Sequence, residues 1–62
     1  MKLLSTYTSA DKKRKSDVSI VDEQTYAVEY YSKEKLTSYA YYNTYADADL
    51  AAEKYVLEVD SQ

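Results

Sequence analysis

This chain of 62 residues has no cysteine, no histidine, no glycine and no proline. Without cysteine there is neither a disulfide nor a thiolate metal site, and without histidine the commonest general base and the commonest metal ligand are both absent. A chain this short also buries a smaller share of its surface than a larger domain does. Stability therefore has to come from packing or from a partner.

The lack of glycine and proline bears on the turns, because these two residues normally make up about 12% of a chain. We expect every turn to use ordinary φ values or the tolerant residues Asn and Asp. The polar segment 32–35 is short enough for a hairpin, but it contains neither Gly nor Asn. It therefore predicts a longer loop built on a type I turn rather than a two-residue primed turn.

Long hydrophobic runs are absent as well. The start Met1-Lys2-Leu3-Leu4 is not followed by the apolar run of about 7–15 residues that a signal peptide needs. No segment approaches the roughly 18 apolar residues of a membrane span. We therefore expect a cytoplasmic protein with no membrane partner, and the lack of cysteine is compatible with a reducing compartment.

Three stretches have the composition of β-strands. Residues 26–31 and 36–42 are rich in tyrosine, with valine, threonine and alanine between, and residues 18–21 are short, apolar and mostly β-branched. Such residues suit a pleated, half-buried surface. These stretches predict a meander of about three strands.

A helix is predicted after the last strand. Thr44, with Asp47 three residues later, resembles a capping box, and the early acids complement the positive end of the helix dipole. One helical face carries the apolar positions Ala48, Ala51, Ala52, Tyr55 and Val56. The alternation of Tyr55, Leu57 and Val59 is also compatible with a strand; we favour a helix that continues to about Leu57.

Together these elements predict an α+β fold, a small antiparallel β-meander covered on one face by a single C-terminal helix. The predicted ββ(β)α domain spans residues 18–62. Residues 1–17 form a basic N-terminal arm, for which an irregular, flexible segment and a short edge strand are both open. Charge divides near the same place: residues 1–15 have a formal net charge of +4, and the remainder has −7.

The arm contains a run of four adjacent bases, Lys12, Lys13, Arg14 and Lys15. Adjacent like charges repel one another and disfavour compact structure. A solvated loop is one interpretation of the run, and a segment that contacts phosphate groups is the other.

Nine tyrosines, with no phenylalanine or tryptophan, are the sharpest compositional signal. One helix covers only one side of a small sheet, and strand residues alternate sides. If Val28 faces the helix, then Glu29 and Tyr31 face away; if Tyr42 faces the helix, then Tyr39 and Tyr41 face away. In the register shifted by one residue, Tyr39 and Tyr41 are buried while Tyr42 and Leu36 are exposed. In either register the uncovered face carries tyrosine.

No constellation of residues indicates an enzyme. Asp47, Asp49 and Glu53 fit a helix start better than a cation site, because their spacing matches no calcium loop. Glu29 and Glu58 are not brought together by any feature of the sequence. There is no glycine-rich phosphate loop and no nucleophile elbow. We expect no catalytic residue, no cofactor and no metal.

The order of elements, from residues 26–31 through 43–48 to Ala51-Ala52-Glu53, resembles that of many very small phage-encoded proteins. Over roughly residues 26–59 it is similar in layout to the short inhibitor of bacterial RNA polymerase made by some podophages. The resemblance implies a non-enzymatic protein that binds and inhibits or redirects a host protein. It carries over no individual functional residue.

The sequence thus leads to three hypotheses about function. The first is a small acidic module that binds a host protein with a basic surface through Tyr31, Tyr39, Tyr41 and Glu29. The second is a nucleic-acid-binding protein in which Lys12, Lys13, Arg14 and Lys15 contact phosphates while tyrosines stack on bases. The third is a structural homo-oligomer that covers its open sheet face by self-association.

Overall fold

The computed structural model describes residues 2–57, which form one antiparallel sheet and one helix. The strands are β1 (Lys2–Thr8), β2 (Arg14–Asp22), β3 (Thr25–Ser32) and β4 (Lys35–Tyr42), and the helix is α1 (Tyr45–Leu57). Their order across the sheet follows the chain, so β1 and β4 are the edge strands. The α+β class, with an antiparallel meander and a C-terminal helix, is confirmed; the sheet has four strands where about three were predicted.

The fourth strand comes from the N-terminal segment. β1 pairs with β2 from Lys2 opposite Ile20 to Thr8 opposite Lys15. The edge strand, one of the two alternatives left open by the sequence, is therefore the one formed. The boundary expected between residues 17 and 18 lies within β2, and Arg14 and Lys15 belong to that strand rather than to a loop.

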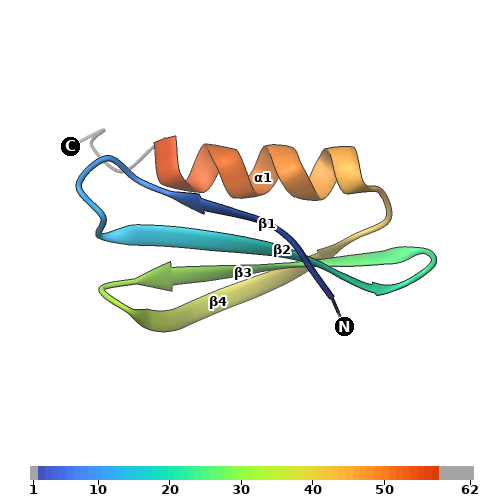
Figure 1. The fold of residues 1–62 in the computed structure, drawn as a ribbon. Helices are drawn as coiled ribbons and strands as arrows, with labels where there is room; N and C mark the ends of the chain where they lie inside the picture. The colour runs from blue at the N-terminus through green and yellow to red at the C-terminus, as the bar shows by residue number, and fades with distance from the viewer. Residues whose placement is uncertain (1, 58–62) are drawn as a thin grey trace.

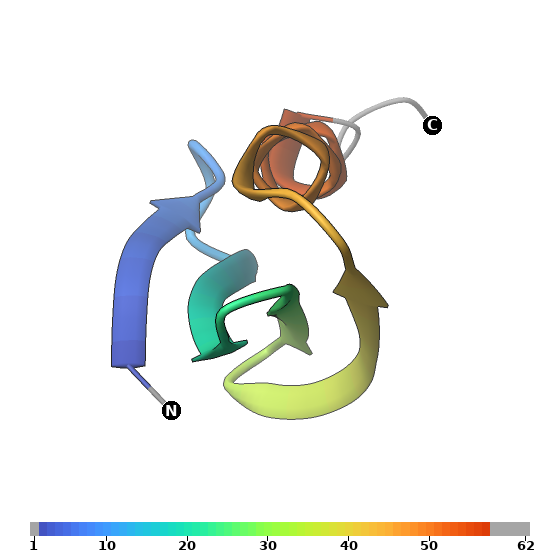
Figure 2. The ribbon, with the colours of Figure 1, turned by 90° about the vertical axis from the view of Figure 1, so that its right-hand side faces the viewer.

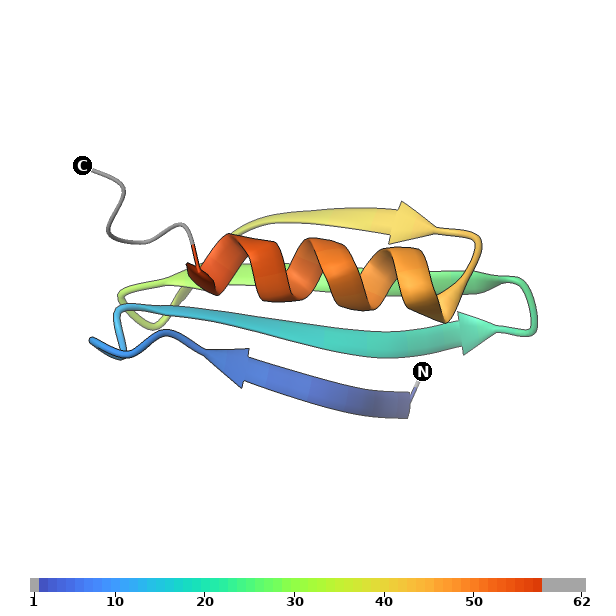
Figure 3. The same ribbon diagram turned by 90° about the horizontal axis from the view of Figure 1, so that it is seen from above.

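The helix lies on one face of the sheet and runs along the strands, mainly over β2 and β3 (Figures 1 and 3). Seen along the strands, it covers that side alone (Figure 2). Thr44 caps the helix as predicted, because its Oγ1 accepts a hydrogen bond of 3.2 Å from the backbone N–H of Asp47, which is one half of a capping box. Residues 55–57 are helical, as favoured; the point at which the helix ends falls outside the described residues.

The core between helix and sheet is thin. Its fully buried residues are Val18, Val28, Ala48 and Ala52, and the partly buried rings of Tyr7, Tyr26, Tyr30 and Tyr42 pack against them. Because the buried helix residues are alanines, the backbone of α1 lies close to the sheet. The tyrosine rings pack around these small residues, at the periphery of the layer between helix and sheet. A phenol suits this position because its apolar ring is buried while its hydroxyl reaches a polar partner.

The register of β3 and β4 agrees with the first of the two predicted registers. Val28 pairs with Ala40, and Tyr26 pairs with Tyr42, on the side of the helix. Glu29 pairs with Tyr39 on the opposite side of the sheet. Alternation along the strands thus places Tyr26 and Tyr42 on the side of the helix and Tyr39 and Tyr41 on the opposite side, as expected.

The turn between β3 and β4 corrects a prediction. Ser32 pairs with Lys35, so the turn has two residues, Lys33 and Glu34, with φ values of 55° and 70°. Positive φ at both central positions is the pattern of a type I′ turn, whose twist matches that of the flanking strands. The expectation of a longer type I loop was wrong because the paired strands outweigh the cost of left-handed residues, about 1–2 kcal/mol each. Lys12, with φ of 63°, also departs from the ordinary values expected of the turns.

Candidate functional site

The face of the sheet that α1 leaves uncovered, called the open face below, is organised in rows across the strands. Its first row is Thr8, Lys15, Tyr31 and Leu36; its second is Thr6, Asp17, Glu29 and Tyr39; its third is Leu3, Ser19, Ala27 and Tyr41. The predicted partner-binding residues Tyr31, Tyr39, Tyr41 and Glu29 all lie on this face.

Tyr39 and Tyr41 are the most exposed of these tyrosines, with 61% and 60% of their surfaces accessible. Their ring centroids are 5.7 Å apart in an edge-to-face arrangement. Both belong to the edge strand β4, whose outer side has no neighbouring strand. The pair therefore presents a contiguous aromatic surface beside unpaired strand backbone.

Tyr31 is placed differently from the other two, because its neighbours already engage it. The Lys15 Nζ lies 4.7 Å from the centroid of the Tyr31 ring, and the Tyr31 hydroxyl donates to Glu29 Oε1 at 3.4 Å. Burial, together with the nearby carboxylates of Glu29 and Asp17, raises the pKa of Tyr31. Tyr31 therefore lies beside the surface formed by Tyr39 and Tyr41, and its ring and hydroxyl are held by Lys15 and Glu29.

Two carboxylates face each other in the middle row. Asp17 and Glu29 are cross-strand partners, and such an arrangement of like charges is destabilising. Hydrogen bonds from Thr6 to Asp17, at 3.0 Å, and from Tyr31 to Glu29 hold the two groups in place. A negative pair therefore lies beside Tyr39 in the second row.

Leu36 joins this surface although simple alternation would turn it toward the helix. An irregularity between Tyr30 and Tyr31 makes Thr37 an extra residue in β4, and Tyr31 then pairs with Leu36. Leu36 is 51% exposed. Because a bulge reverses the facing of the residues beyond it, neither register predicted from strict alternation places Leu36 on the same face as Tyr39 and Tyr41.

The four bases of the N-terminal run lie at one end of the sheet. Lys12 and Lys13 belong to the turn between β1 and β2, and Arg14 and Lys15 begin β2. The Arg14 side chain packs on Tyr55, with its guanidinium carbon 4.9 Å from the ring centroid, and donates to the Tyr55 carbonyl at 3.3 Å. Two further bases lie at the neighbouring turn, Lys33 within it and Lys35 directly after it, and no pattern in the sequence connects them with the run.

Groups of three or more carboxylates suited to a metal ion do not occur among residues 2–57. In the same range, no helix is long and apolar enough to cross a membrane. No protein-family model, curated protein or solved structure matches the chain. The resemblance in layout to small phage-encoded proteins therefore stays a prediction.

Proposed function

We propose that this chain is a small non-enzymatic module that binds another protein through the open face at β4. The observation that carries the proposal is the exposure of Tyr39 and Tyr41, about three-fifths each, on an edge strand. Tyrosine is enriched among residues that dominate binding energy, because it buries a large area with few rotatable bonds. Leu36, more than half exposed, adds aliphatic surface to the same face.

The charges of the open face favour a partner with a basic surface. Asp17 and Glu29 lie side by side next to Tyr39 and repel each other in the free protein. A lysine or arginine of the partner would relieve that repulsion when it approaches the pair. Complementary charge of this kind raises the rate of association and selects among partners. A partner of this chemistry also fits the inhibitor-like role that the resemblance in layout implies.

A comparison of three baits tests the proposal. The wild-type chain, the double variant Tyr39→Ser with Tyr41→Ser, and the control Leu50→Ser are used to capture proteins from a lysate of the source cell. Leu50 is 65% exposed on α1, so its variant removes exposed apolar surface away from the open face. Proteins held by the wild type and by the control are then titrated in pure form.

The expected result is a partner whose affinity falls at least tenfold with the tyrosine double variant, since truncating one dominant interface residue costs about 2 kcal/mol or more. The same partner should bind Leu50→Ser normally and bind Glu29→Gln more slowly. Equal affinity for all three baits would refute the proposal. Sedimentation at several protein concentrations tests the alternative in which a second copy of the chain covers the open face, because self-association would raise the apparent mass with concentration.

A further inference from the structure

The fold gathers most of the bases at one end. The turn between β1 and β2 and the turn between β3 and β4 lie at the same end of the sheet (Figure 1). They are joined by a hydrogen bond of 2.8 Å from the backbone N–H of Lys33 to the carbonyl of Lys13. The basic end so formed contains six bases, Lys12, Lys13, Arg14, Lys15, Lys33 and Lys35, and two acids, Asp11 and Glu34. Its formal net charge is +4.

Four of these bases are free of other tasks within the described chain. Arg14 is held by Tyr55, and Lys15 lies over Tyr31. The ammonium groups of the remaining four have no ion pair or hydrogen bond with residues 2–57, and all four side chains are exposed: Lys12, Lys13, Lys33 and Lys35. Their like charges repel one another, and the two acids of the basic end offset only part of that repulsion.

Asp11, one of the two acids, is held mainly by hydrogen bonds within the turn, with a smaller electrostatic contribution from Lys13. Its Oδ1 accepts hydrogen bonds from the Ser9 hydroxyl at 2.6 Å and from the backbone N–H of Lys13 at 3.0 Å. These bonds, that of Ser9 foremost, lower the pKa of Asp11. The acid thus shapes the turn that carries the bases.

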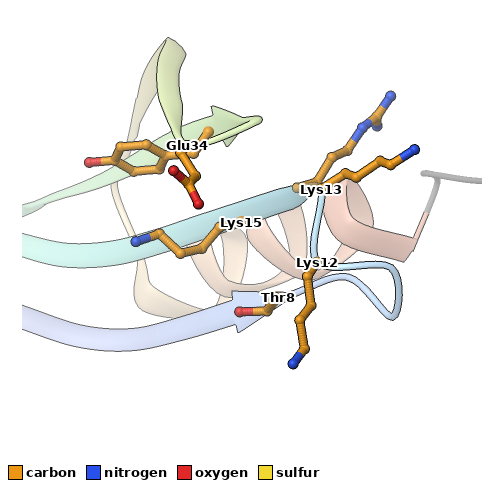
Figure 4. A pocket seen from close by; sticks show the side chains of 7 residues that line it. Thr8, Lys12, Lys13, Lys15 and Glu34 are labelled. Carbon is orange, nitrogen blue, oxygen red and sulfur yellow. The ribbon is translucent and has the colours of Figure 1, made fainter.

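Several side chains of the basic end surround a hollow of about 190 Å³ between the two turns. It is lined by Thr8, Lys12, Lys13, Arg14, Lys15, Tyr31 and Glu34. Figure 4 shows Lys12, Lys13 and Lys15 extending in three different directions from this hollow. Ammonium groups spread in this way match several separate negative charges on an extended ligand better than one small anion.

We propose that the basic end binds the phosphate backbone of a nucleic acid, next to the surface proposed for the protein partner, which it meets at Lys15 and Tyr31. Residues 9–15 and 33–35 of the basic end include no exposed large apolar side chain, and Leu36, which follows Lys35, is the exposed leucine next to them. Interfaces between proteins have an apolar centre depleted in lysine, whereas interfaces with nucleic acid are polar and strongly positive. This composition favours a nucleic acid over an acidic protein.

The rest of the molecule restricts how the ligand lies. Asp22, Glu23 and Asp47 lie at the far end, and Asp17 and Glu29 occupy the middle of the open face. The carboxylates in both regions repel phosphate groups. The nucleic-acid strand is therefore expected to contact the basic end alone. The four uncommitted lysines set a footprint of about four phosphates, which predicts a slope of log K against log salt of about −3 for a single strand.

The test measures fluorescence anisotropy of a labelled oligonucleotide of about 20 nucleotides, single-stranded and as a duplex, over a range of salt concentrations. The variants Lys12→Asn and Lys33→Asn each remove one charge at a position of positive φ, which Asn tolerates well, so the fold is retained. The control Lys2→Asn makes the same change of charge in β1, far from both turns. Thermal unfolding of each variant accompanies the titrations.

Binding to either form at low salt is expected, with the magnitude of the slope reduced by about one in each turn variant and unchanged in the control. Absence of binding at low ionic strength would overturn the proposal. So would equal slopes for the turn variants and the control. Competition by polyglutamate as strong as by unlabelled oligonucleotide would replace the nucleic acid with an acidic protein as ligand.

Discussion

The hydroxyl of Tyr7 in β1 donates a hydrogen bond to the carboxylate of Asp49 in α1, and so joins the edge strand to the helix across 42 positions of sequence. A second link, between the Ser5 Oγ and the Tyr45 hydroxyl at 2.6 Å, lies along the same strand. Because β1 has a neighbouring strand on one side only, these contacts with α1 supplement its pairing with β2.

The Tyr7 link predicts how stability responds to alkaline conditions. The bond to Asp49 raises the pKa of Tyr7 from 10.0 to about 12. Between these values the unfolded chain has lost the proton and the folded chain keeps it, so stability falls as pH rises. The contribution is fully present below pH 10 and lost by about pH 12. Tyr7→Phe should lower the melting temperature at neutral pH and make its alkaline decline shallower.

Thermal unfolding of both proteins across this range, with tyrosinate absorbance as a second readout, checks the prediction. Tyr30 and Tyr31 also have raised pKa values, the former mainly from burial and its hydroxyl contact with Tyr42, so some alkaline decline remains in the variant. If the two proteins lose stability in parallel, Tyr7 is not responsible for the alkaline response.

Ser16 is predicted to matter for stability although it is small and polar. It is fully buried in β2, and its hydroxyl donates to the carbonyl of Ala52 at 2.8 Å. Ser16→Ala should lower the free energy of unfolding by about 1 kcal/mol, the usual net value of such a bond. Urea denaturation measures the loss. The exposed Ser38 in β4 provides the control, and Ser38→Ala should change the same quantity by less than about 0.5 kcal/mol.

A larger side chain at Ala52 is predicted to overpack the layer between α1 and the sheet. This residue is fully buried against the sheet, whereas Ala46, in the first turn of the same helix, is exposed. Ala52→Leu should destabilise the protein by about 1–3 kcal/mol through overpacking. Ala46→Leu should be close to neutral in the same denaturation measurement. A neutral Ala52→Leu would mean that the helix is free to move away from the sheet.

The two-residue turns offer a matched pair of glycine substitutions. Glu34 has a φ of 70°, whereas Glu23, in the turn between β2 and β3, is not among the residues with positive φ. Relief of a left-handed residue is worth about 1–2 kcal/mol, and the added freedom of the unfolded chain costs about 0.4–1 kcal/mol. Glu34→Gly should therefore stabilise the protein by roughly 0.5–1 kcal/mol.

Glu23→Gly should instead destabilise it by about 0.4–1 kcal/mol, because the entropic cost has no compensation. Calorimetric unfolding of the two variants beside the wild type distinguishes them by the sign of the change. Loss of stability in both variants would contradict the type I′ geometry of the turn between β3 and β4.

The facing of β3 and β4 could be predicted from the sequence because alternation acts residue by residue. Once Tyr42 is assigned to the side of the helix, alternation places Tyr39 and Tyr41 on the open face, and the structure selects this register over the one shifted by one residue. The helix start was predictable for a similar reason, since the Thr44 cap is a local contact. The helix start depends on neighbours within a few residues, and the facing of β3 and β4 depends on a single hairpin.

β1 was left open because its alternation is imperfect, and the structure shows an irregularity there between Leu3 and Ser5. The facing of Leu36 was missed for the related reason that a bulge is not encoded by periodicity. In both cases the pairing with a neighbouring strand, rather than local propensity, decides which way the side chains point.

The sequence by itself determined the helix with its cap, the strand character of β3 and β4, and the excess of tyrosines over what one helix can cover, since each depends on local propensity and spacing. Tertiary structure alone decided the type I′ turn, the place of Leu36 and the meeting of Lys33 and Lys35 with the run that begins at Lys12. These features require two hairpins to lie side by side, and the free energy that holds them there comes from the paired sheet as a unit.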